Sequence, residues 1–168
     1  MKKIDISTKK YPNTFALVDD DDFSRLSVRK WRPIFTKTNA YALAFSINPS
    51  TGRESTTRMH RVIMGVEHRS YCLIDHVNRD GLDNRKLNLR IATSSQNGMN
   101  SNMYSNNKSG YKGVYWWSYY NKWRAAITFN NKRRYLGLFT CLIKAAKAYD
   151  KAAIEHHGQF ANLNFPKK

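Results

Sequence analysis

The chain has 168 residues and a formal net charge of +17 at pH 7, with a sequence pI near 10.1. A field of this sign attracts polyanions and points first to nucleic acid, although a membrane surface or an acidic protein would also fit the charge alone. Aromatic residues make up 13% of the sequence, which argues against a disordered basic tail.

Cysteine usage and hydropathy indicate where the protein works. The two cysteines, Cys72 and Cys141, form no CxxC pair, so we expect free thiols in a reducing compartment and no structural zinc. No apolar run approaches transmembrane length, and the N-terminus has no signal-peptide core. These features predict a soluble cytoplasmic protein, in a bacterial host or at its nucleoid, that is not secreted.

Short elements are expected in the first part of the chain. The apolar run Phe15 to Val18 leads through Asp19 to Asp22 into a short helix, and these carboxylates fit a helix start better than a metal site. Tyr41 to Ile47 predicts a strand that turns over Asn48 to Gly52 and returns at Thr56 to Arg58 as an antiparallel ribbon. A short helix then follows from Met59 and ends at Gly65.

The stretch from Leu73 to Asn100 predicts a strand, a polar loop, a second strand and a helix. Its first strand ends at Asp75 and His76, and a loop rich in Asn, Asp and Gly comes next. Leu87 to Ala92 alternates apolar with polar residues, as a half-buried strand does. Thr93 and Gln96 match a capping box, which places Asn97 in the first turn of a helix.

The residues of this stretch resemble the HNH nucleases with their ββα-metal fold, in particular the homing endonucleases of phages and introns. The match comprises Asp75-His76, Asn88-Leu89-Arg90 and Asn97. The resemblance implies that His76 is the general base, that Asp75 and Asn97 bind one divalent cation, and that Asn88 steadies the loop and orients His76. Many members carry His at the position of Asn97. An Asp-His pair beside a turn is by itself more often a solvated loop, and only the full spacing favours a nuclease.

The chemistry of these residue types agrees with the resemblance. Phosphodiester hydrolysis needs an activated water and a cation that offsets the charge on the leaving oxygen. A neutral imidazole can take the proton, and oxygen ligands suit Mg²⁺ or Mn²⁺. No small-molecule cofactor is expected. His60 and Arg61 resemble the His-Arg element that precedes the motif, so we assign His60 a supporting role and make Arg61 the candidate for a phosphate contact. Arg90 is expected either to support the site or to bind phosphate.

The region after Asn100 predicts a linker at 101–109 and then three strands and a helix. The strands are expected at Lys112 to Trp117, Trp123 to Phe129 and Arg133 to Phe139, and the helix from an N-cap at Thr140 to about His157. Alternation turns one of the adjacent tryptophans inward, and we assign Trp116 to the core and Trp117 to the outer face.

These strands and the helix resemble the AP2 DNA-binding domain over nearly the whole region. The motifs that carry the resemblance are Tyr111-Lys112-Gly113-Val114, Lys122-Trp123-Arg124-Ala125-Ala126-Ile127, Tyr135-Leu136-Gly137, Ala145-Ala146-Lys147-Ala148-Tyr149-Asp150 and Leu163-Asn164-Phe165-Pro166. The family lays its sheet into the major groove of DNA, which implies outward contacts from Lys112, Tyr115, Trp117, Arg124, Arg133 and Tyr135. Ala126 and Thr128 replace outward Glu and Arg of the family, so the target sequence is not inherited.

The combined expectation is an α+β protein of two modules. Residues 1–100 would form an HNH nuclease domain with an N-terminal β-ribbon, 101–109 a linker, and 110–168 an AP2-like three-stranded antiparallel sheet packed on one helix. The expected activity is site-directed, metal-dependent cleavage of double-stranded DNA by a monomer of a phage or mobile element. A DNA-binding regulator with a vestigial nuclease site and an RNA-binding protein that stacks bases on its aromatics remain alternatives.

Overall fold

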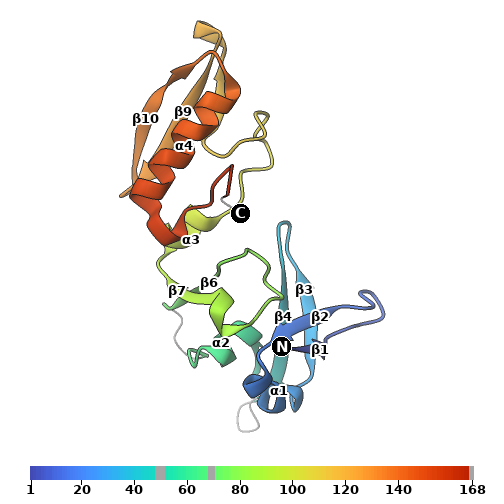
Figure 1. The fold of residues 1–168 in the computed structure, drawn as a ribbon. Coiled ribbons are helices and arrows are strands. Elements are labelled where there is room, and N and C mark those ends of the chain that lie inside the picture. The colour runs from blue at the N-terminus through green and yellow to red at the C-terminus, as the bar shows by residue number, and fades with distance from the viewer. Residues whose placement is uncertain (48–51, 68–70, 167–168) are drawn as a thin grey trace. The chain divides into compact units, whose positions relative to one another are not determined.

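The computed structural model describes residues 1–47, 52–67 and 71–166, and the chain forms two compact units, Met1–Ala92 and Thr93–Lys168 (Figure 1). The architecture is mixed α+β, with small antiparallel sheets and, in the described ranges, four helices. None of these helices is long and apolar enough to cross a membrane. The boundary between the units lies directly before Thr93, ahead of the predicted end of the first domain at residue 100. Of the turn expected over Asn48 to Gly52, residues 48–51 fall outside the described residues.

The first unit contains three small antiparallel sheets and two short helices. The expected strands near Tyr41 and Thr56 and the helices near Phe23 and Met59 are confirmed, and the apolar run Phe15–Val18 forms a further strand. Two other strands were not predicted, because one carries Pro33 and the other is only four residues long. The elements are β1 (Lys2–Asp5) paired with β2 (Phe15–Val18); β3 (Trp31–Phe35), β4 (Ala40–Ile47) and β5 (Glu54–Arg58) in the order β3-β4-β5; β6 (Leu73–His76) paired with β7 (Leu89–Ala92); α1 (Asp20–Ser27), α2 (Met59–Ile63) and the 3₁₀ turn η1 (Lys86–Asn88).

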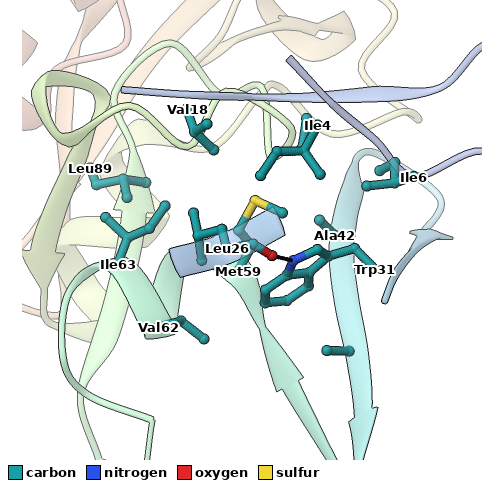
Figure 2. Packing of buried hydrophobic residues seen from close by; sticks show 12 residues of the cluster. Ile4, Ile6, Val18, Leu26, Trp31, Ala42, Met59, Val62, Ile63 and Leu89 are labelled. Atoms are coloured by element: carbon teal, nitrogen blue, oxygen red, sulfur yellow. Dashed lines mark hydrogen bonds between the residues drawn. The ribbon is translucent and has the colours of Figure 1, made fainter. Parts of the chain in front are cut away.

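The core of the first unit lies between β4 and the elements that pack on one of its faces. Ala42 and Ala44 point into this core, where Leu26 and Met59 are fully buried (Figure 2). The indole Nε1 of Trp31 donates a hydrogen bond of 2.8 Å to the carbonyl of Leu26, so the one polar atom of this large side chain is satisfied. Because successive side chains of a strand alternate, the intervening residues of β4 belong to the opposite face of the sheet.

The second unit begins with α3 (Ser94–Asn100) and is dominated by a three-stranded sheet with a long helix against it (Figure 1). Its strands are β8 (Val114–Trp117), β9 (Lys122–Phe129) and β10 (Lys132–Phe139), in the order β10-β9-β8, and its helix is α4 (Leu142–His157). All three predicted strands and the helix are confirmed, including the stop at Gly158, whose φ is 53°. The predicted N-cap is wrong by one residue: Cys141, rather than Thr140, precedes the first helical residue.

The two adjacent tryptophans of β8 differ from the prediction in one respect. Trp116 does lie on the opposite face from Trp117, but it is 48% exposed and is not part of the core. Its cross-strand partner Trp123 packs against the cluster of Val114 and α4 instead, and Trp116 lies edge-on to that ring at a centroid distance of 5.0 Å. The core assignment of Trp116 is therefore wrong, because the neighbouring strand already fills the space next to the helix.

A buried carboxylate fixes the C-terminal segment of the second unit on α4. Asp150 accepts hydrogen bonds from the backbone and side-chain nitrogens of Asn164, at 2.8 and 3.0 Å, and from the backbone nitrogen of Phe165 at 2.8 Å. We expect Asp150→Ala to lower the free energy of unfolding by about 2–4 kcal/mol, because three donors lose their acceptor. Urea unfolding of this variant beside Lys151→Ala, an exposed neighbour, measures the effect; an equal loss in both would contradict it.

Candidate functional site

The β6–β7 hairpin presents the Asp-His pair from its first strand. In the register of the hairpin, Asp75 lies opposite Arg90 and His76 lies opposite Leu89. Both side chains of the pair are buried, at 5% exposure each. Asp75 Oδ2 accepts hydrogen bonds from Arg90 Nε and Nη2 at 2.8 and 2.6 Å. The hairpin therefore holds a carboxylate that faces a cation, directly beside an imidazole.

Asn88 fixes the loop that joins the two strands. Its side-chain oxygen accepts from the backbone nitrogen of Asn78 at 2.9 Å, and its side-chain nitrogen donates to the carbonyl of Asp83 at 2.7 Å. The side chains of Asn78 and Asp83 are in turn hydrogen-bonded at 2.8 Å, and Arg85 forms an ion pair with Asp83. One buried amide thus connects both ends of the polar loop that follows His76.

A second imidazole, that of His60, and the phenol ring of Tyr41 enclose the candidate base His76. The rings of His60 and His76 meet edge-to-face with centroids 5.0 Å apart, and the Tyr41 ring lies 5.8 Å from the first and 5.9 Å from the second. Tyr41 also packs against Gly81, where an added Cβ would lie 2.6 Å from the Tyr41 ring. Sequence reasoning missed Tyr41, because nothing in a strand of mixed apolar residues distinguishes the one that reaches the site.

Burial keeps both histidines neutral. Burial, together with the unfavourable electrostatic effect of His76, Arg58 and Arg61, lowers the pKa of His60 to about 3. Burial also lowers the pKa of His76, against the opposing effects of a hydrogen bond with Asn84 and of the nearby carboxylates. A neutral imidazole at neutral pH can accept a proton, so the electrostatics suit a general base.

The depressed pKa of His60 predicts that acid destabilises the first unit. The unfolded chain binds the proton near pH 6.5 and the folded chain only near pH 3, so this stabilisation is complete above about pH 6.5 and is lost as the pH falls toward 3. The loss is on the order of a few kcal/mol. We expect His60→Gln to flatten this pH dependence. Urea unfolding at several pH values, read by hydrogen exchange in peptides of residues 1–92, measures it; an unchanged slope in the variant would exclude His60 as its source.

The arginines expected to bind phosphate are both engaged with the protein. Arg61 donates from Nη1 to the carbonyl of Cys72 and from Nη2 to that of Val66, each at 2.7 Å, and so ties the chain after α2 to the start of β6. Arg90 forms the ion pair with Asp75 described above. Arg61 therefore has a structural role in this unit, and its contact with phosphate stays a prediction.

The helix that carries Asn97 begins as the sequence predicted. The backbone nitrogen of Gln96 donates to Thr93 Oγ1 at 3.2 Å, and Gln96 Oε1 accepts from the backbone nitrogen of Thr93 at 2.8 Å, so the capping box is confirmed. Asn97 is exposed in the first turn of α3 and belongs to the second unit, whereas Asp75 belongs to the first. Within the described ranges, no group of three or more His, Cys, Asp and Glu side chains is arranged to hold a metal ion.

The outer face of the β8–β9–β10 sheet carries a connected set of guanidinium groups and aromatic rings. The Arg124 guanidinium lies 4.2 Å from the ring centroid of Trp117 and 4.8 Å from that of Tyr135, and Arg133 lies 5.0 Å from that of Tyr115. Five of the six residues expected to contact DNA therefore share one surface. Lys112 is elsewhere: its Nζ donates to the carbonyls of Met99 and Ser101 at the end of α3.

Comparisons with known proteins give relatives of two kinds. No protein-family model matches the chain. The chain is 27% identical to an uncharacterized HNH endonuclease, L560, of Acanthamoeba polyphaga mimivirus over 152 residues, which are 90% of this chain and 75% of the relative. It is 42% identical over 67 residues to an AP2-like ethylene-responsive transcription factor of Arabidopsis thaliana, covering 39% of this chain and 19% of that factor.

A third relative decides the family. Over 90 residues, which are 54% of this chain and 74% of the relative, the chain is 33% identical to protein 3.8 of Escherichia phage T7. The chain belongs to the family of protein 3.8. This member of the family is also similar to an HNH endonuclease over most of its length and to a transcription factor over a shorter region.

Proposed function

We propose that the protein is a metal-dependent endonuclease of the HNH type that hydrolyses phosphodiester bonds in double-stranded DNA. The observation that carries the proposal is the β6–β7 hairpin, where a buried neutral imidazole stands next to a carboxylate and above a loop fixed by Asn88. The likeness to an HNH endonuclease over 90% of the chain supports it.

Each residue of the motif has a distinct role in this mechanism. His76 takes the proton of the attacking water, and Tyr41 and His60 hold its ring in a neutral, enclosed environment. Asn88 keeps the loop after His76 in place. These roles suit hydrolysis of a phosphodiester, because the base must be held where it can take a proton from water while the phosphate stays accessible.

A divalent cation fits the oxygen donors that the motif offers. Asp75 supplies a carboxylate that already faces a positive charge, and Asn97 supplies an exposed amide oxygen. Such hard donors favour Mg²⁺ or Mn²⁺ over zinc. When bound, the cation would offset the charge that develops on the leaving oxygen. The assignment of Asn97 rests on its residue type and its place in the motif.

The second unit would hold the DNA through the outer face of its sheet. Arginine and aromatic side chains on a β-sheet suit phosphates, sugars and base edges of a major groove. Because the contacts are mainly electrostatic, affinity should fall steeply with salt. Small side chains at Ala126 and Thr128 leave fewer groups for base reading, so we infer a long and partly degenerate target, as a homing endonuclease of a phage or mobile element would have.

The experiment that tests the function uses supercoiled plasmids that carry a library of candidate sites. Incubation with Mg²⁺ or Mn²⁺ should convert them to the nicked form, and EDTA should prevent this, because one active site in a monomer cuts one strand at a time. Tight DNA binding without cleavage under any divalent cation would instead make the protein a DNA-binding regulator whose nuclease site is inactive.

A further inference from the structure

Besides the basic surface of the second unit, the chain has another in the first unit, on the outer face of the β3–β4–β5 sheet. The inner face of this sheet is buried through Trp31, Ala42 and Ala44 (Figure 2). The outer face is open, and Phe45 and Ile47 on it are 56% and 66% exposed. An exposed apolar strip of this kind in a strongly basic protein marks an interaction surface.

Two arginines lie in one row across this face. Arg32 is the register partner of Leu43, and Leu43 is the register partner of Arg58, so the two guanidinium groups flank the central strand. Neighbouring strands are about 4.8 Å apart, which separates the two Cα atoms by roughly 10 Å. Each guanidinium rests on an aromatic ring, Arg32 on Phe45 at 5.8 Å and Arg58 on Tyr41 at 5.7 Å.

The cationic ends of these side chains are available to a ligand. In the described part of the chain, neither Arg32 nor Arg58 forms a hydrogen bond or an ion pair, and both residues are exposed. They differ in this from Arg61 and Arg90, whose donors are engaged with carbonyls and with Asp75. Burying an arginine against a carbonyl satisfies its donors, whereas an exposed guanidinium on a ring keeps its donors for an anion.

The arginine row leads to the candidate base. Tyr41 is on the same face as Leu43, two residues earlier in β4, and its ring contacts both His60 and His76. Arg58 directly precedes α2, the helix that carries His60, and its charge contributes to the lowered pKa of that histidine. A polyanion that lies along the row is therefore guided toward the edge of the site.

We propose that the outer face of β3–β4–β5 binds the sugar-phosphate backbone of duplex DNA beside His76, with Arg58 and Arg32 on two phosphates of one strand. The two Cα atoms lie roughly 10 Å apart, and arginine side chains are long, so both guanidinium groups can reach neighbouring phosphates of one strand. Phe45 and Ile47 would contact the apolar edges of the sugars. The inference rests on the proposed function and assigns the contacts that keep the cleaved strand against the site.

The test measures DNA affinity of the full chain as a function of salt, in EDTA, with the His76→Ala background so that no cleavage occurs. Arg32→Gln with Arg58→Gln should lower the slope of log affinity against log salt by about 2, because two phosphate contacts are lost. The matched control removes two exposed lysines of the same unit, Lys2→Gln with Lys9→Gln, and should leave the slope within about 0.5 of the parent. An equal change in both pairs would overturn the proposal.

A photocrosslinker gives a readout that does not depend on charge. With p-benzoylphenylalanine in place of Phe45, we expect crosslinks to duplex DNA, and with the same group in place of Val28, which is exposed in a different element, we expect none. The crosslinking result can be interpreted separately from the test of nuclease activity. If the wild type cleaves DNA but position 45 gives no crosslink, only the proposed DNA-binding surface is wrong. If position 45 crosslinks but no metal-dependent cleavage occurs, the proposed nuclease activity is wrong and the surface stands.

Discussion

Replacement of His76 by alanine is expected to lower the rate of metal-dependent cleavage by about 10²–10⁴-fold and to leave DNA affinity unchanged. The size follows from the loss of a general base, and the selectivity follows from burial, because a side chain with 5% exposure offers no surface to the DNA backbone. Single-turnover cleavage with saturating protein separates the chemical step from binding, which is measured in parallel on uncleaved duplex.

The matched control for this prediction is another histidine. His156 lies in α4 of the second unit, where its ring stacks on Phe129. His156→Ala should cleave at the parental rate. Equal loss in the two variants would point to a general effect of removing an imidazole, and a drop in affinity for His76→Ala would mean that this residue holds DNA instead of activating water.

The largest effect on stability is expected from Gly113→Ala. An added Cβ would lie 1.9 Å from Tyr149 Cδ2 and 2.8 Å from the carbonyl of Ala126, and Tyr149 is buried against the sheet. The backbone of Gly113 also has a φ of 76°, which costs a side-chain-bearing residue about 1–2 kcal/mol. Together with overpacking of about 1–3 kcal/mol, the free energy of unfolding of the second unit should fall by about 3 kcal/mol or more.

The same glycine-to-alanine change at Gly98 is expected to raise the stability of the second unit instead of lowering it. Gly98 lies inside α3, and an added Cβ there meets nothing within 4 Å. We expect a gain of about 0.5–1 kcal/mol, because alanine favours a helix over glycine. The stability of the two variants is compared by urea unfolding, detected by tryptophan fluorescence. Their DNA affinity is measured separately. If Gly113→Ala left both stability and affinity at the level of Gly98→Ala, the close packing of Tyr149 on Gly113 would be wrong.

Local signals predicted the elements well wherever periodicity and caps coincided. The strands of the second unit have alternating apolar residues and end at a turn of Asn130 and Asn131, both with positive φ, which is a conformation that asparagine tolerates. The capping box of Thr93 is a four-residue pattern with its own hydrogen bonds, so it needs no tertiary information. β1 was missed because it has only four residues, and β3 was missed because it carries Pro33.

The contacts of the site could not be predicted from the sequence, because they join side chains from elements that are distant in the chain. Residue type predicted a phosphate contact for Arg61, but it could not show that two of its donors bind the carbonyls of Cys72 and Val66. Tyr41 joins the site only because β4 brings it against two histidines from later elements. Likewise, alternation gave the correct face for Trp116, yet its exposure depends on the neighbouring Trp123 and not on the strand itself.

The stacked guanidinium of Arg124 has a consequence for the thermodynamics of binding. Trp117 and Tyr135 hold it from two sides, and its buried Nε has no hydrogen-bond partner among the described residues. A free arginine at a protein surface loses about 0.5–1.5 kcal/mol of rotamer entropy when a complex immobilises it. Arg124 has lost most of that freedom before DNA arrives, so its contact would be made at a smaller entropic cost than those of the lysines around it.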